Sequence, residues 1–99
     1  MRNPFYTEYV RHCLRFYTRN PNITQFNSLV DKENWYACQR AASGYPGDVQ
    51  EIILQVYTLR DTMADNVYEV AKANRIDVNI FWDIVKELER NVAKNRGLI

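Results

Sequence analysis

Apolar side chains recur every three to four residues along most of this chain, which is the spacing of amphipathic helices. The first such run predicts a helix over residues 4–19, with Asn3 as its N-cap and Pro4 as its first residue. Its inward positions are Tyr6, Val10, Cys13 or Leu14, and Tyr17. The segment "NPNITQFNS" then predicts a loop, anchored to the core by Ile23 and Phe26.

The second predicted helix has Asp31 as its N-cap and ends near Gly44. Val30 and Trp35 have the spacing of a hydrophobic staple around this start. The inward positions of this helix are Trp35, Cys38, Ala41 and Ala42.

Two further helices follow the tight connection "GYPGD". Asp48 and Glu51 have the spacing of a capping box for the third helix, and Thr62 with Asp65 repeats that signal for the fourth. Asn74 can adopt the left-handed conformation that ends the fourth helix. The inward positions are Val49, Ile52, Ile53, Val56 and Tyr57 in the third helix, and Val67, Val70 and Ala71 in the fourth.

The fifth predicted helix begins after Asp77 as N-cap and ends at Gly97. Ile76 and Phe81 form its hydrophobic staple. Its apolar stripe consists of Val78, Phe81, Val85, Leu88 and Val92, widened by Ile80 and Ile84.

The whole pattern predicts an all-α fold, a compact five-helix domain that covers residues 1–99. No segment has the sustained alternation of apolar and polar residues that strands need, and the chain contains no internal repeat. A length of 99 residues suits a single core. Within this domain, residues 1–47 form an N-terminal helical pair and residues 48–99 form a helix-turn-helix-like half.

Charge gives no strong indication of a nucleic-acid partner, because the net charge is only +1. Residues 1–47 carry six Lys or Arg against three acids, whereas residues 48–99 carry seven against nine. The positive excess therefore lies in the first half. Aromatic residues make up 13% of the chain, a heavy load that predicts a well-packed core and a protein-contact surface.

The sequence offers no arrangement of residues for catalysis, for a metal or for a cofactor. Cys13 and Cys38 lack zinc-ligand spacing, and one His cannot complete a four-ligand site with them. His12 and Cys13 are adjacent in a helix and point about 100° apart, which excludes a nucleophile–base pair. We therefore expect a non-enzymatic protein without cofactor or small-molecule substrate. No signal-peptide or membrane-spanning segment is evident, so a cytoplasmic location without membrane partner is expected.

The last two predicted helices have the order of residues of a helix-turn-helix motif. Small and apolar side chains must fill certain places so that the two helices can cross closely. Those places are filled by Val67, Val70, Ala71, Ile76, Phe81 and Ile84. Two positions depart from the motif, since Asn74 replaces an apolar residue and Arg75 replaces a glycine.

The segment "DVQEIILQVYTLRDTMADNVYEVAKANRIDVNIFWDIVKELERNVAKNRGLI" resembles region 4 of sigma-70-type factors. It is also similar to small helix-turn-helix proteins of Firmicutes phages and mobile elements, of the late-transcription-regulator type. The resemblance covers the C-terminal half of the chain and rests on the spacing and on the ending "VAKNRGLI". It implies a DNA-binding transcriptional regulator whose last helix enters the major groove.

In this interpretation the DNA-binding side chains point outward from the last helix and from the turn before it. Asn79 suits adenine, and Asp83 can accept a hydrogen bond from cytosine N4. Phosphate contacts are expected from Lys72, Arg75, Lys86 and Arg90. Asp83 and Glu87 depart from the basic reading helix that is usual in the family, because acids repel phosphate.

Two other sets of residues are candidates for contact with a partner. Arg11, Arg15 and Arg19 form a basic stripe on the first helix. The stripe predicts a patch that binds phosphate or an acidic partner; the alternative is a face that is simply solvated. Tyr9, Phe16 and Trp82 predict a surface for a protein partner or a homodimer.

Two functions therefore remain open at this point. One is a regulator of phage or mobile-element type that binds double-stranded DNA. The alternative is a protein-interaction module, an inhibitor or adaptor of a larger host or phage complex. Near-neutral charge, acids on the last helix and surplus aromatic residues favour the alternative.

Overall fold

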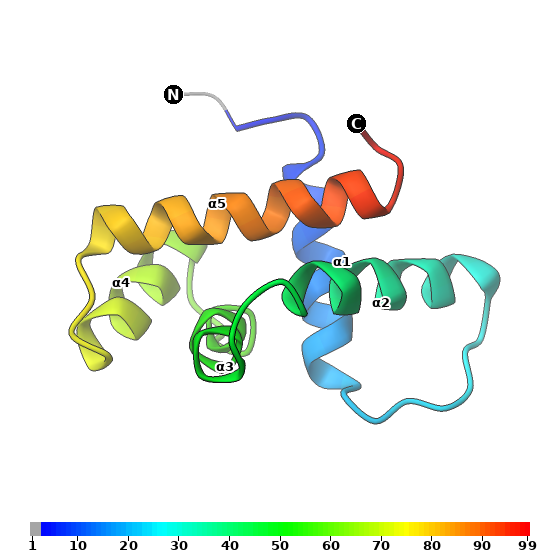
Figure 1. Cartoon of the computed structure of the whole chain (residues 1–99), viewed down its shortest axis with the longest axis horizontal. Helices are drawn as coiled ribbons and strands as arrows, with labels where there is room; N and C mark the ends of the chain where they lie inside the picture. Colours follow the sequence, from blue (N-terminus) through cyan, green and yellow to red (C-terminus); the bar gives the residue numbers. More distant parts are fainter. Residues whose placement is uncertain (1–2) are drawn as a thin grey trace.

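A computed structural model of the chain describes residues 3–99, which form five helices and no strand (Figure 1). This confirms the predicted all-α fold. The helices are α1 (Thr7–Arg19), α2 (Leu29–Ala42), α3 (Gly47–Gln55), α4 (Met63–Ala73) and α5 (Val78–Asn95). No helix in the described part of the chain is long and apolar enough to cross a membrane.

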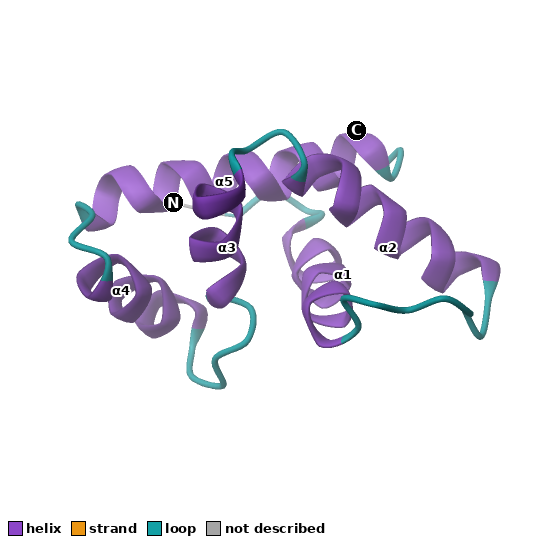
Figure 2. Cartoon of the chain, turned by 60° about the horizontal axis from the view of Figure 1, so that its bottom comes forward, coloured by secondary structure: helices purple, strands orange, loops and turns teal. Residues whose placement is uncertain are grey.

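Helix α5 is the element around which the other helices are arranged. Its 18 residues extend about 27 Å at 1.5 Å per residue, along a molecule that measures 38 Å in its longest dimension. Helix α4 packs along the N-terminal half of α5, and α2 packs along the C-terminal half (Figures 1 and 2). Helix α1 contacts both α2 and α5, so the core draws on both ends of the sequence.

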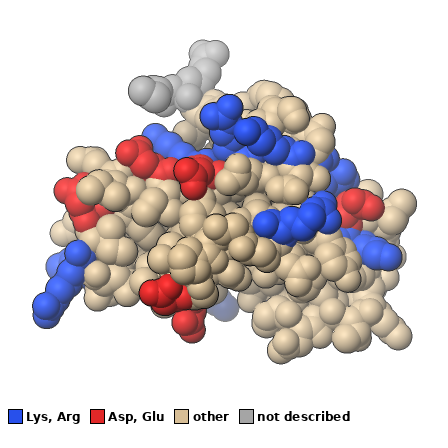
Figure 3. All heavy atoms as spheres, in the orientation of Figure 1, with Lys and Arg blue, Asp and Glu red and all other residues tan. Residues whose placement is uncertain are grey.

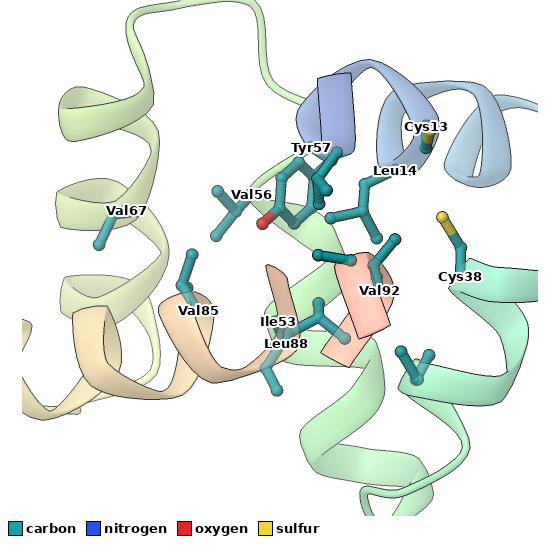
Figure 4. Packing of buried hydrophobic residues seen from close by; sticks show 14 of the residues in the cluster. Cys13, Leu14, Cys38, Ile53, Val56, Tyr57, Val67, Val85, Leu88 and Val92 are labelled. Carbon is teal, nitrogen blue, oxygen red and sulfur yellow. The ribbon is translucent and has the colours of Figure 1, made fainter. Parts of the chain in front are cut away.

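The core is a single cluster of apolar side chains that comes from all five helices (Figure 4). Leu14, Ile53 and Val92 are at most 1% exposed and meet where α1, α3 and α5 come together. At the other end, Val67 of α4 and Val85 of α5 are both fully buried. Burial of each such side chain contributes about 1.5–3 kcal/mol, so this cluster is the main source of stability.

Most of the inward positions predicted from periodicity are confirmed, including the α2 stripe Trp35, Cys38, Ala41 and Ala42. Ile80 is an exception, because its side chain is 58% exposed. Successive helical residues point about 100° apart. Since Phe81 is directed into the core, its neighbour Ile80 is directed toward solvent.

The starts of α1, α2 and α3 differ from the predictions. Asn3 does not cap α1, which begins three residues after Pro4 at Thr7 and has no side-chain cap. Asp31 does not cap α2 either, because Ser28 takes that place and its hydroxyl accepts a hydrogen bond from the Asp31 amide at 3.1 Å. Helix α3 follows Pro46 without a side-chain cap, so Asp48 lies in its first turn.

Because α2 starts earlier than expected, the predicted staple between Val30 and Trp35 is also wrong. Val30 lies within the helix and is 52% exposed, whereas Trp35 is buried. The ring of Trp35 packs instead against Phe26 of the preceding loop, with ring centroids 6.0 Å apart. Its indole Nε1 donates to the Asn20 carbonyl at 2.9 Å. Phe26 thus holds the loop against Trp35 of α2, and Ile23, the other predicted anchor, is half-buried.

The caps predicted for the two C-terminal helices are confirmed. The Thr62 hydroxyl accepts from the Asp65 amide at 3.2 Å, and the Asp77 carboxylate accepts from the Asn79 and Ile80 amides at 2.9 and 3.1 Å. Gly97 has φ +79° immediately after α5 and ends it as predicted. The boundaries of the α4–α5 pair are therefore set by local chemistry at both of its starts.

Candidate nucleic-acid interface

The turn between α4 and α5 is closed by backbone hydrogen bonds. The Ile76 amide donates to the Ala71 carbonyl at 2.9 Å, and the Arg75 amide donates to the Lys72 carbonyl at 3.2 Å. This pair of bonds is a Schellman motif, which needs a left-handed residue just after the helix. Arg75 has that conformation, with φ +56°.

The prediction that Asn74 is the left-handed residue is therefore wrong. Asn74 has φ −105°, and its side-chain amide donates to the Val70 carbonyl at 2.8 Å. Arg75 occupies the place where a helix-turn-helix usually has glycine, and it adopts the backbone conformation that glycine favours. The turn after α4 is thus built with a left-handed arginine in place of a glycine.

The outer face of α5 carries the residues predicted to contact DNA. Asn79, Asp83, Lys86 and Arg90 are all exposed and recur every three to four residues, so they form one stripe. Lys72 and Arg75 are also exposed, at the end of α4 and in the turn. The buried residues Phe81, Val85 and Leu88 lie on the opposite side of α5 and hold it against the core.

Part of this stripe borders a surface hollow between α4 and α5, which we call the α4–α5 hollow. Asn79, Trp82, Asp83 and Lys86 line it from α5, and Met63 and Ala64 line it from the start of α4. Asn3 and, from α1, Arg11 complete the lining. Arg90 lies one helical turn beyond Lys86. Lys72 and Arg75 are at the opposite end of α4 and do not line the hollow. The hollow thus brings together Asn79, Asp83 and Lys86, whereas Lys72 and Arg75 lie outside its lining.

The two acids predicted to weaken DNA binding have different surroundings. Glu87 accepts a hydrogen bond from the Tyr45 hydroxyl at 2.6 Å, so its carboxylate is directed toward the connection between α2 and α3. Burial and the nearby Glu87 raise the pKa of Tyr45, which keeps the phenol protonated as the donor. Asp83 lines the α4–α5 hollow and is the acid that a ligand on this face meets.

The residues predicted as a partner surface do not form one patch. Trp82 is half-buried in the α4–α5 hollow, and the Lys86 ammonium lies 5.8 Å from its ring centroid. Tyr9 is 40% exposed on α1, where its hydroxyl donates to Asn34 of α2 at 3.1 Å. Phe16 is half-buried two turns farther along α1. The structure therefore separates Trp82 from the other two.

The predicted basic stripe on α1 is interrupted at its first residue. Arg11 is only 7% exposed, and its Nε donates to the Glu89 carboxylate of α5 at 3.0 Å. Because position 11 faces α5, the charge of this guanidinium is neutralised inside the fold. The stripe is therefore neither a patch of three exposed arginines nor a fully solvated face. Arg15 is half-buried and Arg19 is exposed, and both line a second hollow together with Arg60.

Arg60 is the residue near this surface that sequence reasoning missed. It belongs to "LRD" in the connection between α3 and α4, where no periodic pattern indicates a direction for its side chain. Only the packing of α1 beside that connection places Arg60 near Arg15 and Arg19. No signal in the sequence could have identified this grouping.

Charge on the molecule is mixed in sign. Figure 3 shows Lys and Arg side chains interspersed with Asp and Glu on the face drawn in Figure 1, with large uncharged areas between them. This agrees with the net charge of +1 and means that any attraction to nucleic acid must come from local groups of cations.

The cysteines lie inside the fold and not at this surface. Burial raises the pKa of the Cys13 thiol to about 11, and burial also raises the pKa of Cys38. Both thiols are therefore protonated near neutral pH, which is the unreactive form. Within residues 3–99, no group of three or more His, Cys, Asp or Glu side chains is placed to hold a metal ion.

Comparison of the chain with protein-family models, with curated proteins and with solved structures finds no match in any of the three.

Proposed function

We propose that this protein is a small transcriptional regulator that binds double-stranded DNA through α4 and α5, which act as a helix-turn-helix. The observation that carries the proposal is the exposed stripe Asn79, Asp83, Lys86 and Arg90 on α5, directly after a turn that Asp77 and Arg75 fix. A stripe of this kind at the start of the second helix is the part of a helix-turn-helix that contacts base edges.

Side chains of suitable chemistry stand at each place on this stripe. Asn79 can donate to and accept from an adenine edge, and Asp83 can accept from cytosine. Lys86 and Arg90 follow farther along the helix, where a cation can reach a phosphate. Glu87 is engaged by Tyr45, which leaves one acid on the reading stripe.

Fluorescence anisotropy of a labelled random 20-base-pair duplex tests this proposal at 50 and 200 mM KCl. We expect micromolar binding that weakens steeply with salt, because phosphate contacts release counterions. Lys86→Gln with Arg90→Gln should weaken binding and lower the slope of log K against log salt by about 0.9 for each lost contact. The absence of salt-sensitive binding at micromolar protein would overturn the proposal.

A second candidate function, a protein-interaction module, is favoured by apolar side chains on the outside of α2. Leu29 is 70% exposed and its neighbour Val30 is 52% exposed, and Tyr36 on the same helix is 39% exposed. Adjacent exposed aliphatic residues of this size are typical of contact surfaces. Sedimentation equilibrium over a hundredfold range of concentration tests the homodimer form of this function, and a constant monomer mass would exclude it.

A further inference from the structure

We infer that the second hollow is a groove for the phosphate backbone of DNA, which holds the duplex beside α5. Arg15, Thr18 and Arg19 of α1 form one wall, and residues 58–61 of the α3–α4 connection form the other. We call this hollow the arginine groove. The inference rests on the proposed DNA-binding function and adds a site on a different part of the molecule.

The three arginines of the groove are available to an external anion. Within residues 3–99 the ion pairs join Arg11 to Glu8 and to Glu89, so Arg15, Arg19 and Arg60 have no carboxylate partner there. Asp61 is the acid that lines the groove. Three cations and one anion leave a local charge of +2, although the whole chain carries only +1.

The guanidinium groups are the side-chain donors that this site offers. The hydroxyl of Thr18 donates to the Arg15 carbonyl at 3.0 Å, and that of Thr58 donates to the Gln55 carbonyl at 2.8 Å. Both hydroxyl protons are therefore engaged inside the protein. Guanidinium presents several N–H donors in a planar fork that fits phosphate oxygens in pairs. Recognition in the groove thus depends on charge and on bidentate hydrogen bonds from arginine.

The groove adjoins the α4–α5 hollow. Arg11 borders that hollow and Arg15 borders the groove, and these residues are one turn apart on α1. On the other side, Asp61 of the groove and Met63 of the hollow are separated by one residue, Thr62. The α5 stripe and the arginine groove are therefore neighbouring parts of one surface.

The arrangement of cations suits a chain of phosphates better than one small anion. Arg15 and Arg19 are separated by one helical turn, which is a rise of about 6 Å along α1. This is comparable to the separation of neighbouring phosphates on one strand. Arg60 approaches from the opposite wall. A nucleic-acid backbone that follows the groove can meet all three guanidiniums in turn.

The test compares two variants that lose the same charge. R15Q/R19Q/R60Q removes the cations of the groove, and K32Q/R40Q/K94Q removes three exposed cations of α2 and α5 that line neither hollow. Binding of the labelled 20-base-pair duplex is measured by anisotropy from 50 to 200 mM KCl. Thermal unfolding of both variants, followed by circular dichroism, checks that the fold is unchanged.

We expect the groove variant to bind about 10- to 100-fold more weakly at 0.1 M salt, and its salt slope to fall by about 2–3, because each phosphate contact contributes about 0.9 to the slope. The charge-matched variant should keep more than half of the wild-type slope. The groove proposal would be overturned if the two variants had equal salt slopes. If K86Q/R90Q still weakened binding in that case, the proposed function would remain intact.

A second probe separates the two proposals further. If wild-type protein fails to bind the duplex, the proposed function and the DNA groove are both overturned. Titration with sodium tripolyphosphate then shows whether the three arginines hold a free polyphosphate instead. If wild-type protein binds both probes, and the groove variant loses tripolyphosphate but keeps full duplex affinity, the groove does not contact DNA.

Discussion

The Arg11 guanidinium of α1 lies 3.0 Å from the Glu89 carboxylate of α5, although 78 residues separate them in the sequence. Both side chains are buried, and the Tyr57 hydroxyl donates to the same carboxylate oxygen at 2.8 Å. Burial, followed by the charge of Glu89, raises the pKa of Tyr57. These three residues join α1, the turn after α3, and α5 through one buried polar group.

Neutralising Glu89 should destabilise the fold strongly. Glu89→Gln preserves the shape of the side chain but leaves the Arg11 charge buried, with only the exposed Glu8 carboxylate 3.9 Å away. Removing one partner of a buried pair costs about 3–5 kcal/mol. Solvent at Glu8 softens the effect, so we expect a loss of about 3 kcal/mol in the free energy of unfolding, measured by urea denaturation.

Two further variants serve as a control and as a rescue for this measurement. Glu69→Gln changes an exposed acid on α4 and should alter stability by less than about 0.5 kcal/mol. The double variant R11M/E89Q removes the buried charge of Arg11, keeps an amide oxygen that can accept from the Tyr57 hydroxyl, and should recover most of the loss. A Glu89→Gln protein as stable as Glu69→Gln would show that the pair is not held as described.

Stability should fall as the pH rises above 9, because of the buried thiols. Burial raises the pKa of Cys13 from 9.0 to about 11. The folded protein therefore holds this proton more tightly than the unfolded chain, and deprotonation favours unfolding. The contribution is fully present below pH 9 and is lost between pH 9 and about 11. Each such group can add a slope of up to about 1.4 kcal/mol per pH unit.

Cys13→Ala should make this dependence shallower. The cavity left by the smaller side chain lowers stability at every pH, so the informative quantity is the change in free energy of unfolding between pH 8 and 10. Wild-type protein and the variant are compared by urea denaturation at pH 8, 9 and 10. The Cys38 thiol, whose pKa is also raised, remains and gives a residual slope. Identical slopes would contradict the assignment to Cys13.

Replacing Arg75 by glycine should stabilise the turn between α4 and α5. A side chain in the left-handed region costs about 1–2 kcal/mol, and glycine avoids this cost but loses more entropy on folding. We expect a net gain of about 0.5–1 kcal/mol, which corresponds to a rise of about 3–6 °C in Tm for a domain of this size. Arg75→Ala keeps the Cβ atom and removes the charge, so it should give no gain.

The sequence was sufficient to predict the five helices and most of the buried residues, because both follow from local periodicity. The sequence predicts Thr62 and Asp77 as caps, because in each case a polar residue stands immediately before an apolar run, and both predictions are confirmed. At α2 the sequence analysis predicts Asp31 as the cap, whereas Ser28 takes that place in the structure. The spacing of Ser28 and Asp31 matches a capping box, a signal that would have identified the observed start.

The grouping of charged residues could not be predicted in the same way. The stripe on α5 follows from helical geometry alone, and its exposure agrees with that geometry. The burial of Arg11 and the approach of Arg60 to Arg15 depend on how α1 crosses the other helices. Crossing angles arise from the packing of side chains distant in sequence, so no local pattern contains them.

Removing the acid from the arginine groove should strengthen DNA binding. The Asp61 carboxylate lines the groove with Arg15, Arg19 and Arg60, and it repels a phosphate that enters. At about 6 Å in water this repulsion amounts to roughly 0.7 kcal/mol, so Asp61→Asn should raise duplex affinity about threefold at low salt. Glu33→Gln on α2, an exposed acid that does not line the groove, should leave the affinity nearly unchanged.

The gain should also disappear when Asp61→Asn is combined with R15Q/R19Q/R60Q, because the DNA backbone then no longer follows the groove. Equal affinities for Asp61→Asn and Glu33→Gln would mean that no phosphate passes near residue 61.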